Sequence, residues 1–433
     1  MEWWLIVILF FGGLLLAFLS SIPIAIAFLL VDIVGMYFVI GPNFSNQLIG
    51  SIYDSVATFT LTPVPLFVLM GEVLFNSGLA LKAIGTIDKW LGKIPGRLSV
   101  LSVVSGALFA SLSGSTIANT AMLGSLLTPE MQRRNYHKSM IVGPIMASGS
   151  LAMMIPPSTL TVVFGSLAGI NVGNLLIAGL LPGLLLAGLY AVYTIGRCWL
   201  NPKLAPAYEV EHVEFRQLLA ETVKNVLPLG LVIVLTVGAI VVGLTTPTEA
   251  ASVGTLISFL VAWFLGDMNK GVIKKSIMNS MRVTAMILII VAASTAFSQV
   301  LAFSGATQQL MQLVTNLPLS PLWILVGMLA VVFLLGMFIE EVSIMMITLP
   351  IFMPIVTTMN IDPVWFGILM LLILEISLLT PPVGLLLYTI KGVTPDEITM
   401  NDIWKAAWPY VFCGLVAVLI ILKFPVITML LIS

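Results

Sequence analysis

Charged residues are scarce in this chain. Of its 433 residues, only 9% are charged while 59% are apolar, and the mean hydropathy is +1.14. Because a soluble domain carries about 25% charged residues, this composition excludes a soluble globular protein and indicates an integral protein of the lipid bilayer. The formal net charge of −1 gives no reason to expect a nucleic-acid partner.

Cysteine is also rare. Cys198 and Cys413 are the two cysteines, and both lie in apolar runs. They have no metal-ligand spacing and no pattern that indicates disulfides. The first residues, Met1 to Trp4, include no basic residue of the kind that precedes the apolar core of a cleaved signal peptide. We therefore expect the first apolar segment to be retained.

Lysine and arginine are missing from one long stretch. The 108 residues between Arg282 and Lys391 contain neither, whereas the corresponding stretch of the first half contains at least seven. Loops rich in Lys and Arg stay in the cytoplasm. A second half that resembles the first but lacks these charges in equivalent loops is therefore predicted to be inserted in the opposite orientation. Inverted repeats of this kind are typical of secondary transporters.

Twelve apolar segments follow one another along the chain, and most are near the ~20 residues that a membrane-spanning helix needs. They cover residues 4–19, 22–40, 63–80, 98–130, 139–165, 175–197, 226–243, 247–265, 283–303, 321–358, 364–390 and 405–431. The segment 98–130 is too long for one crossing, has basic residues on both sides and contains Ser113-Gly114-Ser115 at its middle. A segment that enters and leaves on one side is a re-entrant hairpin.

The two halves repeat each other. Pro129, Pro156 and Pro157 recur 225 residues later as Pro354, Pro381 and Pro382. We predict repeat one at 1–200 with its hairpin at 98–130, a cytoplasmic linker at 201–224, and repeat two at 225–433 with its hairpin at 321–358. The charged residues of the linker, from Glu209 to Arg216, indicate a surface helix.

The predicted fold is therefore an all-α polytopic membrane protein with two inverted-topology repeats, each with about five spanning helices and one re-entrant helical hairpin. Five crossings are an odd number, so the second repeat starts on the opposite side. The basic loops place both termini outside the cytoplasm.

The hairpins and the proline breaks after them contain the candidate functional residues. The first hairpin offers the hydroxyls and backbone of Ser113, Gly114, Ser115 and Thr116, and the amide of Asn119. The second places Glu340 opposite Ser115, with Glu341 beside it. The breaks are Ile155-Pro156-Pro157-Ser158 and Thr380-Pro381-Pro382-Val383-Gly384. Prolines free backbone carbonyls and leave a helix N-terminus at the break, so the carbonyls and hydroxyls suit Na⁺ and the N-termini suit a carboxylate.

Simpler interpretations exist for each of these features. A Ser-rich turn can serve small-residue helix packing, and a Pro-Pro pair can be a kink. Their recurrence at one offset favours function. Glu340 and Glu341 are costly in an apolar run and are expected to be functional, and Glu375 is a weaker candidate. Asp32 and Glu72 are expected to be helix-end or packing residues.

Two other functional classes were weighed. A channel with paired re-entrant hairpins would conduct downhill and without saturation. An intramembrane hydrolase is disfavoured because the chain contains neither G-x-S-x-G nor H-E-x-x-H and no His near an intramembrane Ser.

Several motifs in order resemble one family over the whole chain. They are Ser113 to Thr120, Ile155 to Ser158, Thr246-Pro247-Thr248-Glu249-Ala250 and Leu379 to Gly384. They resemble the large membrane subunit of the tripartite ATP-independent periplasmic (TRAP) transporters of bacteria and archaea.

The resemblance implies an ion-transporter-type elevator and no enzymatic activity. It implies Na⁺-coupled import of a carboxylate such as a C4-dicarboxylate or a sialic acid. The expected partners are a small membrane (Q) subunit and a periplasmic substrate-binding protein, in the bacterial inner membrane.

On this basis we expect a transport domain at about 98–170 plus 321–390, with the remainder as scaffold. The expected Na⁺ sites are at Ser113–Asn119 and at Thr380–Gly384, with Glu340 nearby. Substrate is expected at Ser113, Ser115, Ser158, Glu340 and Thr380.

Overall fold

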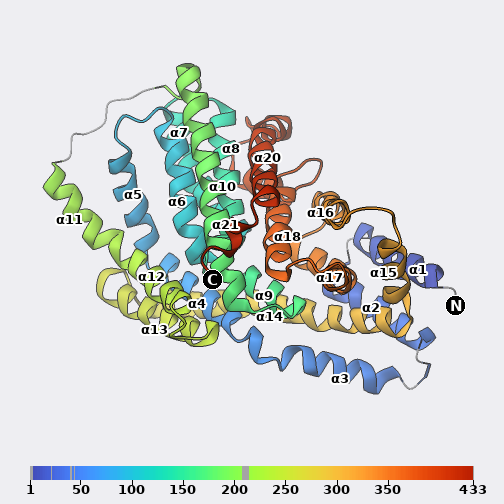
Figure 1. The fold of residues 1–433 in the computed structure, drawn as a ribbon. Helices are drawn as coiled ribbons and strands as arrows, with labels where there is room; N and C mark the ends of the chain where they lie inside the picture. Colours follow the sequence, from blue (N-terminus) through green and yellow to red (C-terminus); the bar gives the residue numbers. More distant parts are fainter. Residues whose placement is uncertain (1–2, 21, 40, 43, 207–213, 433) are drawn as a thin grey trace.

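The computed structural model describes all residues except 1–2, 21, 40, 43, 207–213 and 433. The described residues form helices joined by turns, with no strand among them (Figure 1). The first half contains α1 (Trp3–Leu19), α2 (Ile24–Val39), α3 (Phe44–Val56), η1 (Phe59–Leu61), α4 (Pro63–Asn76), α5 (Leu79–Leu91), α6 (Arg97–Ser113), α7 (Thr116–Arg133), α8 (Lys138–Gly149), η2 (Ser150–Met153), α9 (Thr159–Ala168) and α10 (Val172–Leu200).

The connection between the halves contains the short η3 (Pro202–Leu204) and then α11 (Phe215–Asn225). The second half contains α12 (Leu227–Val241), α13 (Pro247–Leu265), α14 (Lys270–Phe303), α15 (Ala306–Thr315), α16 (Pro321–Gly336), α17 (Glu341–Thr358), α18 (Pro363–Ser377), α19 (Leu385–Val393), α20 (Met400–Lys423) and α21 (Val426–Met429). The expected linker helix thus begins at Phe215, and the part of that prediction at 207–213 lies outside the described residues.

Helix length and composition confirm the all-α membrane prediction. Six helices of the described chain are long and apolar enough to cross a membrane, and a bent α11–α12 pair would make a seventh. Other predicted crossings are shorter apolar helices, such as α16 and α18. Each proline break divides one predicted segment into two helices: 139–165 becomes α8 and α9, and 364–390 becomes α18 and α19.

Equivalent backbone features recur in the two halves. α7 and α17 each contain 18 residues, with Pro129 inside the first and Pro354 inside the second. Each helix is followed by an asparagine in the left-handed region, Asn135 at φ 58° and Asn360 at φ 53°. The order of elements also matches, except that the single helix α14 takes the place of α3, η1 and α4.

The sequence explains several helix boundaries. Thr246 caps α13 and forms a capping box with Glu249, as the proline and acidic residue at this position indicate. Thr399 and Asp402 form the same arrangement at the start of α20. Each capping side chain satisfies a backbone N–H that has no partner within the helix.

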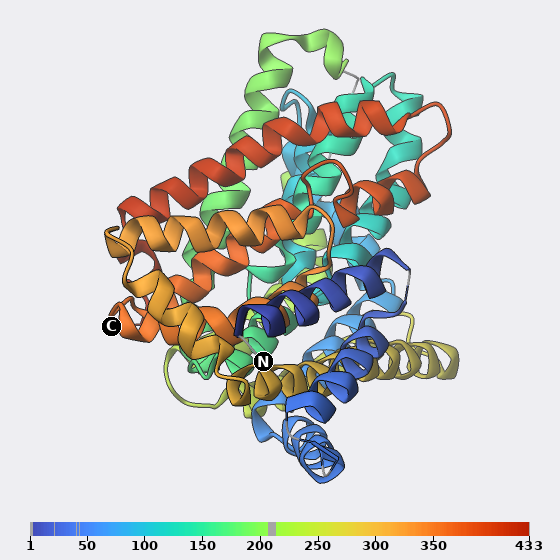
Figure 2. The same cartoon turned by 90° about the vertical axis from the view of Figure 1, so that its right-hand side faces the viewer.

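The helices pack into two groups. The first, called here the α4 group, comprises α1–α4 and α11–α14, in which α4, α13 and α14 pack extensively on one another. The second, called the α8 group, comprises α6–α10 and α16–α21, in which α8 packs against α6, α7 and α20. Figure 2 shows α3 (blue) and α20 (red) on opposite sides of the molecule. The packing thus extends the unit expected at 98–170 and 321–390 by α10 and α20.

Short helices connect the groups. α5 follows α4 and packs on α6 and α11, while α15 follows α14 and packs on α17. α14 lies along one side of the molecule and reaches α15 at its end (Figure 1). The two groups therefore meet mainly through contacts of α4 with α6 and α9, and of α14 with α17.

Candidate functional site

The tip of the first hairpin is a sharp turn between α6 and α7. Gly114 is in the left-handed region, at φ 57°, where residues with a side chain are strained. A Cβ at this position would also lie 2.7 Å from Thr159 Oγ1. Ser115 then caps α7, its side chain accepting a hydrogen bond from the backbone N–H of Ala118 at 3.3 Å. Glycine is therefore required both by the turn and by the close approach of the first proline break.

The first proline break ends in a second capped helix. Ser158 caps α9 and accepts a hydrogen bond from the N–H of Thr161 at 3.3 Å. The Ser158 side chain is almost fully buried. Because Gly114 touches Thr159, the N-termini of α7 and α9 come together at one point. Two helix N-termini in one place create a region of positive potential that favours an anion.

The tip of the second hairpin is capped by an acid. Glu340 accepts hydrogen bonds from the N–H groups of Val342 at 3.0 Å and Ser343 at 2.9 Å, and from the Ser343 hydroxyl at 2.7 Å. Ser115 and Glu340, which correspond in the repeat, therefore both act as N-caps. Most of the hydrogen-bonding capacity of the Glu340 carboxylate is used within its own turn.

Glu341 links the two hairpins. Its Oε1 accepts a hydrogen bond from the Thr116 hydroxyl at 3.2 Å. The side chain is 5% exposed, and its Oε2 has no hydrogen-bond partner. Sequence reasoning named Glu341 only as a neighbour of Glu340, because a contact across 225 residues leaves no local signal.

The second proline break lies against the second hairpin. Gly384 donates its N–H to the carbonyl of Met337 at 3.0 Å. The hydroxyl of the buried Thr380 donates to the carbonyl of Ile376 at 2.9 Å. A Cβ on Gly336 would lie 1.8 Å from Ser377 Oγ, so the missing side chain at 336 makes room for the serine. Each break is therefore paired with the tip of its own repeat.

Glu375 ties the two repeats together at the breaks. It is fully buried in α18 and accepts a hydrogen bond from the N–H of Met153, at the end of η2. Asn119 ties the first hairpin to α8, since its Nδ2 donates to the carbonyls of Gly106 at 3.2 Å and Ser148 at 3.3 Å. Its Oδ1 has no partner, and neither does Thr159 Oγ1.

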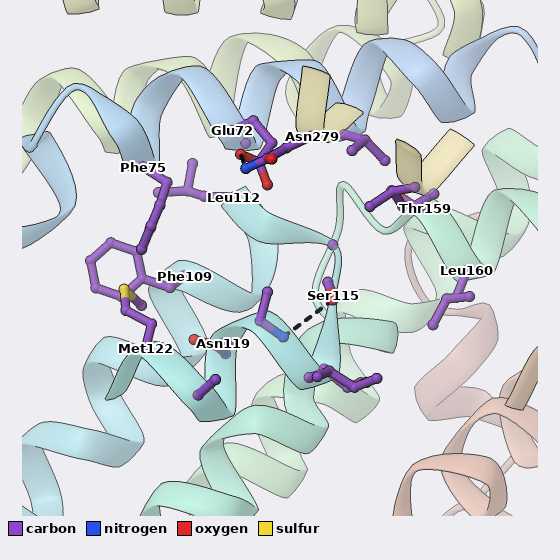
Figure 3. Close-up of a pocket in the computed structure, with 18 of the residues that line it drawn as sticks. Glu72, Phe75, Phe109, Leu112, Ser115, Asn119, Met122, Thr159, Leu160 and Asn279 are labelled. Atoms are coloured by element: carbon purple, nitrogen blue, oxygen red, sulfur yellow. Dashed lines mark hydrogen bonds between the residues drawn. The ribbon is translucent and has the colours of Figure 1, made fainter. Parts of the chain in front are cut away.

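A cavity of about 500 Å³ lies between the hairpins and the α4 group. Figure 3 shows Glu72 and Asn279 on the opposite side of this space from Ser115 and Asn119. Of the expected site residues, its wall includes Gly114, Ser115, Asn119 and Glu340. Among the described residues, Ser158, Thr380, Pro381 and Gly384 are not part of the wall, and the Ser113 side chain lies outside the described part.

The α4 group contributes polar residues that sequence reasoning missed. Glu72 Oε2 accepts hydrogen bonds from Asn76 Nδ2 at 2.8 Å and Asn279 Nδ2 at 2.9 Å. Lys275, one turn before Asn279, also lines the cavity and is exposed. Polar pairs four residues apart on otherwise apolar helices, Glu72 with Asn76 and Lys275 with Asn279, were the available signal. Glu72 is therefore a cavity residue as well as a packing residue.

The described wall contains three carboxyl groups, from Glu72, Glu340 and Glu341, and one basic side chain, Lys275. Within the described residues, no group of three or more His, Cys, Asp or Glu side chains has the arrangement of a conventional metal centre. The arrangement instead offers hydroxyls, amide oxygens, helix N-termini and single carboxylates.

Comparisons with known proteins agree with this geometry. Residues 9–427 match the family described as "Tripartite ATP-independent periplasmic transporter, DctM component". The C4-dicarboxylate TRAP transporter large permease protein DctM of Pseudomonas aeruginosa is 34% identical over 391 residues, which cover 90% of each chain. The isethionate TRAP transporter permease protein DctMQ of Oleidesulfovibrio alaskensis is 28% identical over 87% of this chain and 59% of its own length.

A solved structure shares the fold at low sequence identity. The YdaH transporter of Alcanivorax borkumensis superposes with a TM-score of 0.63 and 14% identity, over 87% of this chain and 86% of the other. The family match covers nearly the whole chain and includes both hairpins and both proline breaks. The chain therefore belongs to the DctM family of tripartite ATP-independent periplasmic transporters, as a large, multi-pass membrane permease component.

Proposed function

We propose that this permease imports a small organic anion together with Na⁺, and that the α8 group moves as an elevator against the α4 group. The observation that carries the proposal is the charge of the cavity, where three carboxyl groups face one ammonium group. Like charges repel in a partly desolvated site, so an anion is disfavoured there unless cations accompany it. Cations that bind together with the anion remove this repulsion, and such joint binding is the basis of ion-coupled transport.

The proposed Na⁺ ligands are the oxygens of the two hairpin tips. The first site is formed by Ser113, Gly114, Ser115 and Asn119, and the second by Thr380, Pro381 and Gly384 near Glu340. Unwound backbone in discontinuous helices commonly coordinates Na⁺ in secondary transporters. The buried Asn119 Oδ1, Thr159 Oγ1 and Glu341 Oε2, which lack hydrogen-bond partners, support a cation near the first tip.

The substrate anion is proposed to bind where the N-termini of α7 and α9 meet, at Ser115 and Ser158. The DctM relative is described by its C4-dicarboxylate and the DctMQ relative by isethionate, which is a sulfonate. Both ligands are small organic anions, and we extend this class to the present chain. Lys275 adds a cation at the α14 end of the cavity.

The motion is proposed from the packing. α6–α10 and α16–α21 form the moving body, which includes α10 and α20 because they pack on it. α1–α4 and α11–α14 form the scaffold, and α5 and α15 act as connecting arms. The basic residues of α14, from Lys270 to Lys275, suggest that the cavity opens toward the cytoplasm, with both termini on the opposite side of the bacterial inner membrane.

Two partner proteins complete the proposal. The family is tripartite by description, and the DctMQ relative is a longer permease of which this chain matches 59%. We propose that a separate small membrane subunit packs on the scaffold. A substrate-binding protein outside the inner membrane would deliver the anion.

Uptake into proteoliposomes tests the proposal. The permease, its small subunit and the binding protein are reconstituted with an inward Na⁺ gradient, and C4-dicarboxylates and isethionate are offered. We expect saturable uptake that stops when K⁺ replaces Na⁺ and falls at least tenfold in Ser115→Ala with Thr380→Ala. Uptake that persists without Na⁺ contradicts the coupling, and non-saturating flux without the binding protein favours a channel.

A further inference from the structure

A second cavity of about 500 Å³ lies far from the hairpin tips, in the seam between α10 and α20. α10 and α20 lie side by side in the α8 group (Figure 1). The residues of the groove that matter here are Leu189, Tyr193 and Arg197 from α10, and Pro409, Phe412 and Val416 from α20. None of them belongs to the wall of the central cavity.

The groove faces the lipid. α10 and α20 are both long and apolar enough to cross the membrane. Their outer faces expose large apolar side chains, including Val192 at 70% and Phe412 at 61%. Such faces are disfavoured in water and are stable against acyl chains.

The floor of the groove is a packed aromatic cluster. The rings of Tyr193 and Tyr410 are 5.1 Å apart and those of Tyr190 and Tyr410 are 5.5 Å apart, both edge to face. The hydroxyl of Tyr410 lies 2.9 Å from that of Thr194. Tyr190 and Tyr410 are fully buried. This cluster holds α10 and α20 at a fixed separation, so the groove is a preformed feature of the fold.

Two basic residues stand at one end of the groove. Arg197 lies one helical turn beyond Tyr193, and Lys405 lies one turn before Pro409 on the same face of α20. Both are exposed, and neither forms an ion pair with the described residues. The exposed Trp199 and Trp408, at 71% and 42%, lie nearby in sequence, as is common at a membrane–water interface.

We propose that this groove binds an anionic phospholipid of the cytoplasmic leaflet. The phosphate lies between Arg197 and Lys405, and an acyl chain lies along Tyr193, Phe412 and Val416. Charge complementarity selects this occupant, because basic pockets between membrane helices on the cytoplasmic side bind anionic headgroups. The apolar length of the groove beyond the two cations accommodates a chain that a soluble anion lacks.

Native mass spectrometry of the delipidated permease, alone and with its small subunit, tests the proposal. Phosphatidylglycerol and phosphatidylcholine with identical acyl chains are titrated separately. We expect one phosphatidylglycerol to bind in preference to phosphatidylcholine. In Arg197→Gln with Lys405→Gln the apparent Kd rises about thirtyfold, since each basic residue near the surface contributes about 1 kcal/mol.

Matched variants separate the groove from general charge effects. Lys270→Gln with Lys274→Gln removes the same charge from the exposed start of α14 and should leave the Kd unchanged. Cys413→Phe fills the groove with both cations kept and should weaken binding, whereas Val192→Phe adds the same bulk outside the groove and should not.

Three results would overturn the proposal. They are an equal rise of the Kd in the α14 variant, equal binding of the two lipids, and displacement of the lipid by glycerol phosphate, which would identify a soluble anion as the ligand. Loss of binding when the small subunit is present would assign the groove to a protein contact instead. These outcomes do not depend on transport, so they are distinct from a failure of the proposed function.

Discussion

At the scale of single residues, the central cavity combines one exposed lysine with three acids, and the acids differ in their partners. Glu72 is held by two amide groups, Glu340 caps its own helix, and Glu341 reaches across to the other hairpin. Of the three, Glu341 keeps a buried oxygen without a partner. Glu341 is therefore the acid in this cavity best placed to serve a transported cation.

We expect Glu341→Gln to raise the Na⁺ concentration for half-maximal uptake at least tenfold. Glutamine keeps the shape and an acceptor for Thr116 but removes the charge, and a tenfold change corresponds to about 1.4 kcal/mol. Uptake at varied Na⁺ measures the effect. Glu397→Gln, an exposed acid in the loop before α20, is the control. An unchanged Na⁺ dependence in Glu341→Gln would argue against this role.

Lys275 leads to a separate prediction about the anion. Lys275→Gln should raise the half-saturating substrate concentration in counterflow exchange about fivefold, since a partly exposed ion pair contributes up to about 1 kcal/mol. Lys274→Gln, whose side chain is not part of the cavity wall, should leave it unchanged. Higher ionic strength should reduce the difference between wild type and Lys275→Gln. Equal effects of the two substitutions would show that the charge acts only at long range.

At the scale of elements, each hairpin depends on a close approach that a side chain would block. Gly336→Ala places a methyl group where Ser377 Oγ now lies. Such overpacking typically costs about 1–3 kcal/mol. We expect Gly336→Ala to lower thermal stability and uptake together, and Gly336→Ala with Ser377→Gly to restore both. A double variant no better than Gly336→Ala would show that contacts other than this one are responsible.

The hairpins could be predicted from sequence because their signals are local. Basic flanks and the Ser113–Ser115 turn marked the first hairpin, and the repeat transferred the assignment to the second. α3, α5 and α15 were not predicted, because they are short and partly polar, so an apolar-run criterion passes over them. α14 begins at Lys270 and not near 283, because its basic first turns are helical although they are not apolar.

The site could be predicted only in part. Ser115, Asn119 and Glu340 were named because they interrupt apolar runs, and they do line the cavity. Lys275 and Asn279 lie on a helix more than 150 residues away in sequence from the first hairpin. Their participation depends on how the α4 group packs against the hairpins, and no local pattern contains that information.

At the scale of the whole molecule, one hydrogen bond offers a direct test of the proposed motion. The hydroxyls of Thr60, in η1 of the α4 group, and Ser166, in α9 of the α8 group, are 2.6 Å apart. This proximity suits a disulfide between cysteines at the two positions. We expect Thr60→Cys with Ser166→Cys to lose uptake on oxidation and regain it on reduction.

The single variants Thr60→Cys and Ser166→Cys are the controls, and they also account for the native Cys198 and Cys413. Full uptake by the completely cross-linked protein would exclude relative sliding of the two groups at this contact. Substrate binding measured in the same oxidised sample separates a blocked motion from a damaged site.

The unbroken helix α14 bears on the energy balance of such a motion. In the first half the same place is taken by α3, η1 and α4, with a break before Pro63. If two inverted repeats were identical, exchanging their conformations would leave the free energy unchanged, and both end states would be equally populated without ligands. A stiff rod in one repeat and a jointed one in the other remove that degeneracy. The transporter should consequently have a preferred resting state, set by its own chain before any gradient is applied.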